Sequence, residues 1–335
     1  MTTLYLIRHG EAEGNIFRRL QGQFDAMITP NGRKQIEALA KRFAPITIDA
    51  VYASDLTRTC ATAGAIYKPK GLPLHRDARF RELGCGVWEN QPFGWLQRID
   101  PERNRAFSKD PKNWSVEGSE PFLTYTGRFL EAMEEVARRH EGQTVAIFSH
   151  GMVMRGVLQR LFFPEKDNLG HSENTAVTKL TYENGTYTLE YLNDASHLPQ
   201  EITTLGCQQW WRRDDRWDFN LWYRDPPPGD GSLAEALGYH GEHDILRYAV
   251  CGEETIGLVA VKPRGETARL TYLGLLPDYR GKGYGPQLLG EGISVARSQG
   301  ATRLVAREPE HPGANRLLTD FGVTGQGLEL IPRVF

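Results

Sequence analysis

The chain has 335 residues, of which 24% are charged, and its 40 basic and 42 acidic residues leave a formal net charge of −2. A chain so close to neutral lacks the basic character of a nucleic-acid-binding protein, and no apolar run approaches the ~20 residues of a membrane span. The length is sufficient for two hydrophobic cores, so we expect two soluble enzymatic domains.

Two short stretches of the chain end in the same way. Residues 3–11 (TLYLIRHGE) and 144–151 (TVAIFSHG) are apolar runs that stop at a His-Gly pair. Such runs are typical of strands that are covered on both faces of a parallel sheet. Because ligands bind beyond the carboxyl ends of these strands, we expect His9 and His150 to face one small molecule.

Arginine residues fall at the same predicted edge. Arg8 precedes His9, and a third apolar run at 48–54 leads into a helix start that Ser54 could cap, with Arg58 in its first turn. Two guanidinium groups, a helix N-terminus and two imidazoles suit a tetrahedral dianion. A phosphate group is therefore the expected ligand.

Five segments then resemble, in this order, the histidine phosphatase superfamily with its phosphoglycerate-mutase-like fold: RHGEAEGN, LQGQFD, SDLTRTCATA, RELGCGVWEN and FSHG. The resemblance covers roughly the first 200 residues and runs to LNDASHL at 192–198. It implies a domain at 1–198 with a mostly parallel sheet and helices on both faces.

The resemblance also implies a role for each matching residue. His9 would be the nucleophile that becomes phosphorylated, and Glu82, preferred to the nearby Glu89, would protonate the leaving alkoxide and then deprotonate water. The residues that would hold the phosphoryl oxygens are Arg8, Arg58 and His150, and those that would line the pocket are Asn15, Gln21, Gly22 and Gly151. Fixed positive groups would stabilise the transferring phosphoryl group, so we expect no metal requirement.

The family also contains mutases, which transfer the phosphoryl group to another acceptor than water. The segment between Glu82 and His150 looks compact and lacks the longer insertions associated with mutases, so hydrolysis is favoured and a mutase-type phosphotransferase is the alternative. Its aromatic residues either form a partly apolar lid or pack in the core; they are Trp88, Phe93, Trp95, Phe107 and Trp114.

The pattern changes from about residue 244. Three strand-like runs at 245–251, 255–263 and 268–276 are separated by short polar turns, which predicts antiparallel hairpins. A glycine-rich loop and an amphipathic helix follow, and then another strand. A glycine-rich loop at a helix N-terminus can cradle a pyrophosphate.

This order resembles the GNAT acetyltransferases and implies a mixed, mostly antiparallel α+β domain at 199–335 that binds acetyl-CoA. The residues of the acyl-CoA loop would be Arg280, Gly281, Lys282, Gly283, Tyr284 and Gly285, and the backbone of Leu275 and Leu276 would pair with the pantetheine arm. The catalytic tyrosine of the family is replaced by Leu318, which leaves Tyr272 as the titratable candidate inside the sheet.

Two readings of the second domain stay open. It transfers an acetyl group to a small-molecule amine, which makes the protein bifunctional, or it is degenerate and binds acyl-CoA as a regulator of the phosphatase. A third hypothesis is that both domains only bind ligands and catalyse nothing. It conflicts with the presence of the full set of residues that the resemblance assigns to a phosphatase site. Residues 199–243 hold four of the seven tryptophans, Trp210, Trp211, Trp217 and Trp222, which would form an acceptor platform or the interdomain seam.

Four cysteines show neither disulfide nor metal-ligand spacing, which suits a reducing cytoplasm. The first strand lacks the features of a signal peptide, so we expect a cytoplasmic protein. The expected partners are a phosphomonoester and an amine acceptor, with no nucleic acid and no membrane, and the sequence is silent on oligomeric state.

Overall fold

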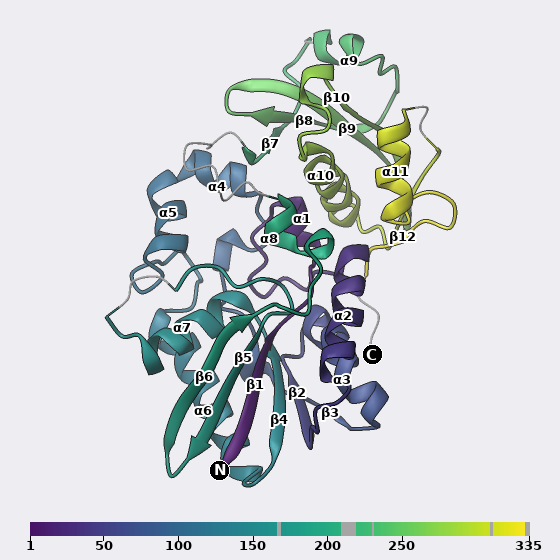
Figure 1. The fold of residues 1–335 in the computed structure, drawn as a ribbon. Coiled ribbons are helices and arrows are strands. Elements are labelled where there is room, and N and C mark those ends of the chain that lie inside the picture. Colours follow the sequence, from purple (N-terminus) through teal and green to yellow (C-terminus); the bar gives the residue numbers. More distant parts are fainter. Residues whose placement is uncertain (166–168, 209–218, 230, 309–310, 332–335) are drawn as a thin grey trace.

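The computed structural model describes residues 1–165, 169–208, 219–229, 231–308 and 311–331. They form two six-stranded sheets, each packed against its own helices. Figure 1 shows the sheet of the N-terminal half below and the sheet of the C-terminal half above. The expectation of a mostly parallel α/β unit followed by a mostly antiparallel α+β unit is confirmed.

The first sheet has the strand order β3-β2-β4-β1-β5-β6. Its strands are β1 (Thr2–Arg8), β2 (Ala50–Ala53), β3 (Leu74–Arg76), β4 (Thr144–Ser149), β5 (Val177–Glu183) and β6 (Thr186–Asp194). The four strands from β3 to β1 run parallel, whereas β5 and β6 are antiparallel to their neighbours. The carboxyl ends of β1 and β4 and the beginning of β5 therefore meet at one edge.

Helices cover both faces of this sheet, which explains why β1 is apolar on both sides. Leu4 and Leu6 pack with α6 (Phe122–Arg139) and α7 (Gly151–Phe162), while Tyr5 and Ile7 pack with α2 (Pro30–Phe43) and α3 (Thr57–Lys70). The shorter helices are α1 (Glu13–Phe17), α4 (Phe93–Ile99), α5 (Pro101–Lys109), α8 (Thr204–Gln208), and the 3₁₀ turns η1 (Ala78–Phe80), η2 (Gly86–Trp88) and η3 (Gln200–Ile202).

The start of α3 is capped by a residue that sequence spacing did not indicate. The Thr57 amide donates to Asp25 Oδ1 at 2.7 Å, and the Thr57 hydroxyl donates to the other oxygen. The Ser54 hydroxyl instead accepts from the Leu56 amide at 3.3 Å, one residue before the helix. The loop after α1 brings Asp25 to the helix end, so the predicted Ser54 cap is wrong.

The aromatic residues between Glu82 and His150 mostly pack in the core. Trp88 and Trp114 are each 4% exposed, and Phe107 lies edge-on to Trp114 with ring centroids 4.9 Å apart. Trp95 is 38% exposed and lies beside Trp222, at a centroid distance of 6.4 Å. Core packing, rather than an apolar lid, is the reading that fits Trp88 and Trp114.

The second sheet has the order β12-β11-β10-β9-β8-β7. Its strands are β7 (Trp222–Arg224), β8 (Ile245–Cys251), β9 (Glu254–Arg264), β10 (Thr267–Leu275), β11 (Arg303–Ala306) and β12 (Leu328–Glu329). β10 and β11 form its parallel pair, and β11 reaches only the first four residues of β10. The edge of β10 from Thr271 to Leu275 is therefore not covered by β11, and a bulge lies where the pairing ends.

Alternate residues of β9 face the two sides of the second sheet. Val259 and Val261 pack with α10 (Tyr284–Ser298), and Leu258 and Ala260 pack with α9 (Ser232–Ala236). The acyl-CoA loop precedes α10 and follows the turn η6 (Pro277–Tyr279), and α11 (Pro312–Asp320) follows β11.

The two halves meet along α1 and α10 (Figure 1). Phe17 at the end of α1 is 3% exposed and belongs to the hydrophobic core of the C-terminal half, where its ring lies 5.5 Å from that of Phe321. A Cβ atom on Gly290 of α10 would lie 2.5 Å from the Cβ of Phe17, so glycine is what allows the two helices to approach this closely.

In the part of the chain that the structure describes, no helix is long and apolar enough to cross a lipid bilayer.

Candidate active site and acyl-CoA site

His9 and His150 lie together at the carboxyl edge of the first sheet. Arg8, the last residue of β1, is in register with Ser149, the last residue of the parallel strand β4, and a histidine directly follows each of them. Their ring centroids are 5.3 Å apart, and the rings are inclined by 56°. The two His-Gly motifs thus lie side by side, and their joint contact with one ligand stays a prediction.

The surroundings of His9 leave one ring nitrogen available. Nδ1 lies 2.7 Å from the carbonyl oxygen of Gly10, which can only accept, so Nδ1 carries the ring proton and Nε2 keeps its lone pair. Burial, followed by the charges of Arg58 and Arg8, lowers the pKa of His9 well below its usual range. The imidazole is therefore neutral at pH 7, as a nucleophile must be.

Arg58 fixes the other histidine. Its Nε donates to Nδ1 of His150 at 3.1 Å, so the proton of that ring lies on Nε2, a buried atom with no hydrogen-bond partner among the described residues. The two Nη atoms of Arg58 donate to the carbonyl oxygens of Phe24 and Gly22, at 2.8 and 2.6 Å. Burial lowers the pKa of Arg58 to about 10, which leaves it charged at neutral pH.

Arg8 adds a second cation. Its Nη1 donates to the carbonyl oxygen of Ser172, and its Nε is buried without a partner in the described structure. A Cβ atom on Gly151 would lie 3.2 Å from this Nε, so the glycine leaves room for the guanidinium group. The unpaired donors of Arg8 and His150 are what an anion would satisfy.

The loop after α1 forms part of the surroundings. Asn15 lies 3.4 Å from the side-chain amide of Asn174, which itself donates to the His9 carbonyl oxygen at 2.9 Å. Gly22 has a positive φ of 49°, and a Cβ atom there would lie 2.2 Å from a carboxylate oxygen of Glu89. This loop therefore needs glycine at position 22 to present its carbonyl oxygen to Arg58.

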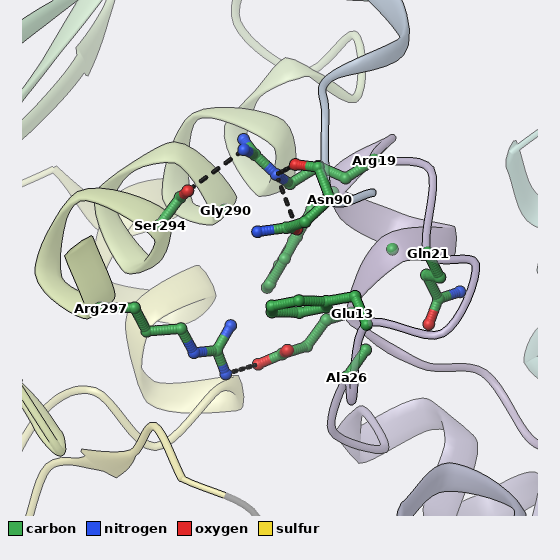
Figure 2. A pocket seen from close by; sticks show the side chains of 11 residues that line it. Glu13, Arg19, Gln21, Ala26, Asn90, Gly290, Ser294 and Arg297 are labelled. Atoms are coloured by element: carbon green, nitrogen blue, oxygen red, sulfur yellow. Dashed lines mark hydrogen bonds and ion pairs between the residues drawn. The ribbon is translucent and has the colours of Figure 1, made fainter. Parts of the chain in front are cut away.

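Gln21 points to a different place from the one that its motif suggested. Its side chain covers Gly14 and lines a cavity of about 10 Å³ between α1 and α10, as Figure 2 shows. Its Oε1 is buried and lacks a partner within the described part of the chain. Contact of Gln21 with a phosphoryl group stays a prediction.

Glu82 lies at the same helix end as His150. Its carboxylate accepts from the amides of Met152 and Val153 at 2.9 and 2.7 Å, in the first turn of α7, whose N-cap is His150. Burial raises the pKa of Glu82, against the opposite effect of these N–H groups. A carboxyl group whose pKa is raised can keep a proton for donation.

Glu89 serves another purpose. Its two carboxylate oxygens accept from the amides of Gln23, Phe24 and Cys85, at 2.7 to 3.0 Å, and so hold the loop that carries Gly22. This difference in position supports the preference for Glu82 as the acid.

The second candidate site is a cavity of 1020 Å³ in the C-terminal half. It is lined by Gly281, Gly283 and Gly285 of the glycine-rich loop and by the uncovered part of β10. Gly283 is the N-cap of α10 and has a φ of 89°, a conformation that favours glycine. The chemistry of this donor set, backbone N–H groups at a helix N-terminus beside Arg280, fits a pyrophosphate.

The residues that the sequence predicts to contact acyl-CoA have different surroundings in the structure. The Leu276 amide already donates to the Ile256 carbonyl oxygen at 2.8 Å, and in an antiparallel ladder the neighbouring Leu275 must then direct its backbone groups to the uncovered edge, where its carbonyl oxygen accepts from Arg280 Nε at 2.9 Å. The Tyr284 side chain is buried in the core, where its hydroxyl accepts from Cys251, and Lys282 lies over the ring of Tyr279. Leu275 and the glycines are thus better placed than Leu276 or the Tyr284 side chain.

Leu318, which occupies the place of the family's tyrosine, is 3% exposed and packs in the core beside the cavity. Tyr272 lines the same cavity, and its hydroxyl donates to the Leu237 carbonyl oxygen. Burial raises the pKa of Tyr272. Neither residue therefore replaces the missing acid in an obvious way.

Comparison with known proteins finds a family for each half of the chain. Residues 4–195, more than half of the chain, match the sequence profile of the histidine phosphatase superfamily (branch 1). The chain belongs to the histidine phosphatase superfamily. Residues 202–323 match the profile of the GNAT acetyltransferase family, so this superfamily member also carries a GNAT domain.

Individual relatives are similar over the length of one domain. Phosphoserine phosphatase 1 of Hydrogenobacter thermophilus is 32% identical over 47% of this chain and 74% of its own length. The probable phosphoglycerate mutase GpmB of Proteus mirabilis is 27% identical over 59% of this chain and 95% of its own length. The solved structure of Bacillus stearothermophilus YhfR has 32% identity and a TM-score of 0.57, covering 59% of this chain and 99% of its own.

Two residues of this histidine phosphatase site escaped the sequence reasoning. The Thr62 hydroxyl accepts from the Gly10 amide at 2.9 Å, and Asn174 holds the His9 carbonyl oxygen. Asn174 precedes β5, and the beginning of a strand comes to the carboxyl edge of its neighbours only when that strand is antiparallel. No local sequence pattern indicates this reversal.

One carboxylate beside the cavity of the GNAT domain was also missed. Asp244, at the turn before β8, lines the 1020 Å³ cavity. Trp222 lies at the seam between the halves, where the guanidinium group of Arg98 sits 4.3 Å from the centroid of its ring. The other tryptophans of this segment, Trp210, Trp211 and Trp217, lie outside the described residues.

Proposed function

We propose that the N-terminal domain hydrolyses a small phosphomonoester through a phosphohistidine on His9. The observation that carries this proposal is the neutral, buried imidazole of His9 with Nε2 available, beside His150 and two arginines. Nε2 attacks the phosphorus atom, and the P–O bond to the substrate alkoxide breaks. The relatives named phosphatase and phosphoglycerate mutase support phosphoryl chemistry of this kind.

Glu82 carries the proton in both steps. In the first step its carboxyl group donates a proton to the leaving oxygen, which would otherwise depart as a poor leaving group. In the second step the resulting carboxylate takes a proton from water, whose oxygen attacks phosphorus while the N–P bond to His9 breaks. The raised pKa of Glu82 supports the protonated starting state.

The remaining predicted residues hold the phosphoryl group. Arg8, Arg58 and the Nε2–H of His150 bind its oxygens, and preorganised donors of this kind stabilise charge that develops in the transition state. The residues that would line the pocket are Asn15, Gln21, Gly22 and Gly151. In this mechanism no step runs through a metal ion.

We further propose that the C-terminal domain binds acetyl-CoA and acetylates a small-molecule amine. The cofactor supplies an activated acetyl thioester. Support comes from the GNAT match and from the fit of the cavity, where Leu275 offers backbone groups and the loop offers the N–H groups of Gly281, Gly283 and Gly285, with Arg280 and Lys282 nearby. Leu276 and Tyr284 would contribute backbone atoms only.

A regulatory domain is the second candidate for the C-terminal half, because Leu318 stands where an acid is expected. Acetyl-CoA would then bind without transfer and change phosphate release. A phosphoglycerate-mutase-type transfer is the alternative for the N-terminal half. We place the boundary between the two proposed units at residues 198 and 199, close to the end of β6 at Asp194.

The experiment that tests this function measures phosphate release from sugar phosphates, amino-sugar phosphates, phosphoserine, phosphoglycerates and nucleotides, without added metal. Wild type is expected to hydrolyse one class, and His9→Ala is expected to lose that activity. Phosphate release by His9→Ala at the wild-type rate would overturn the mechanism. CoA release from acetyl-CoA in the presence of an amine distinguishes transfer from regulation.

A further inference from the structure

Asp244 is a buried carboxylate that the proposed mechanism does not use. Its side chain is only 3% exposed. The hydroxyl groups of Tyr239 and Thr271 donate to its Oδ2, at 2.9 and 2.6 Å. Oδ1 is buried and has no hydrogen-bond partner among the described residues. A buried charged oxygen without a partner is costly, so an incoming donor at Oδ1 would offset that cost.

The place of Asp244 in the fold links it to the acyl-CoA site. It lines the same cavity as the loop glycines Gly281 and Gly283. Thr271, which donates to it, is the residue of β10 just beyond the pairing with β11, where the strands part. The Asp244 residue therefore belongs to the wall of the cavity at the point where the sheet opens.

One cation already lies near this oxygen. Lys262 Nζ is 3.8 Å from Oδ1, beyond hydrogen-bond distance, and donates to the Glu242 carbonyl oxygen at 3.1 Å. Its side chain is 37% exposed, whereas that of Asp244 is 3% exposed. Lys262 is therefore the more exposed partner of this ion pair and does not use Oδ1 as a hydrogen-bond acceptor.

We propose that Asp244 binds the primary ammonium group of the acyl acceptor. This inference rests on the proposed acetyl transfer and names the chemical class of its acceptor. An ammonium group provides a charge-assisted hydrogen bond, which Lys262 at 3.8 Å does not make to Oδ1, whereas an alcohol provides only a neutral donor. Tyr239 and Thr271 orient the carboxylate, so Asp244 is a specificity-determining residue for amines.

The test separates ammonium binding from acetyl transfer. Butylammonium is titrated into the full-length protein, with 1-butanol as the neutral probe, and binding is followed by ligand-observed NMR. We expect wild type to bind butylammonium and to bind 1-butanol at least tenfold more weakly. Asp244→Asn should lose at least tenfold in butylammonium affinity, while Asp320→Asn, which changes an exposed carboxylate of α11, should bind as wild type does.

Lys262→Met provides the discriminating variant. If Asp244 recognises the ligand, removing the competing cation should increase butylammonium affinity. If Asp244 serves only as the partner of Lys262, both variants should weaken stability alike and neither should change butylammonium binding. Equal binding by wild type and Asp244→Asn, or binding by neither, overturns the inference.

Acetyl-CoA binding to each variant, measured by calorimetry, reports whether the domain is folded. CoA release with amines then tests the transfer itself. Absence of CoA release together with Asp244-dependent butylammonium binding would contradict the transferase proposal but not the ammonium site.

Discussion

Arg19 of the phosphatase domain forms a buried ion pair with Glu291 of the acyl-CoA helix α10, at an Nη1–Oε2 distance of 2.9 Å. The side chain of each is 10% exposed, and Arg19 also donates to Ser294 and to Asn90 (Figure 2). A second pair joins Glu13 to Arg297 at 2.9 Å. The loop after α1, which carries Gly22, is therefore held on one side by Arg58 and on the other by α10.

The buried Arg19–Glu291 ion pair should contribute to the stability of the contact between the two domains. Glu291→Leu leaves the Arg19 guanidinium group without its carboxylate, which costs about 3 kcal/mol. We expect the double variant Arg19→Met/Glu291→Leu to recover much of this loss, because the buried Arg19 charge is removed too and Arg247, the second cation beside Glu291, keeps its ion pair with Asp225. A double-mutant cycle of melting temperatures checks this expectation, and simple additivity of the two single variants would contradict it.

Gly290 and Gly127 offer a matched comparison of the same substitution in two helices. A Cβ atom on Gly290 meets the Cβ of Phe17 at 2.5 Å, whereas one on Gly127 of α6 meets nothing within 4 Å. We expect Gly290→Ala to lower the melting temperature and phosphate release, and Gly127→Ala to be stabilising by up to about 1 kcal/mol. Equal effects of the two substitutions would show that α10 does not constrain the loop after α1.

The two site histidines predict an acid-sensitive stability. Their pKa values are held well below the usual range in the folded protein, so below about pH 6.5 the unfolded state takes up protons that the folded state does not. The free energy of unfolding should therefore fall as the pH falls from about 6.5 towards the folded pKa values. Melting temperatures of wild type, His9→Gln and His150→Gln across this range measure the effect.

Both variants should show a shallower loss of stability than wild type, and exposed His240→Gln should not. A wild-type slope retained by His9→Gln and His150→Gln would mean that other groups dominate the acid sensitivity.

The contribution of Glu82 to kcat should depend on how much the leaving group needs a proton. Glu82→Gln keeps one acceptor oxygen for the α7 amides, which donate to both oxygens of Glu82, and cannot protonate the leaving group, so kcat for an alkyl phosphate should fall by ~10²- to 10⁴-fold. With p-nitrophenyl phosphate, whose leaving group needs little protonation, the decrease should be much smaller. The ratio of the two decreases is the measurement, and equal decreases would remove Glu82 from the role of acid.

Much of the fold and of the phosphatase site could be predicted because both rest on local patterns. Apolar runs ending in His-Gly gave the ends of β1 and β4, and parallel pairing then brought His9 and His150 together. Asn174 could not be found in this way, since its position depends on the reversal of β5. Phe17 could not either, because nothing in a helix of the first domain indicates that it completes the core of the second.

The proposed phosphatase mechanism depends on a covalent intermediate on His9. The most direct measurement is rapid acid-free quenching of wild type with its preferred phosphomonoester, followed by mass spectrometry of the peptide that contains His9. We expect one phosphoryl group on His9, labile in acid and stable in alkali, that is absent from His9→Ala. Phosphate release without any phosphorylated His9, or with the label on another residue, would contradict the account.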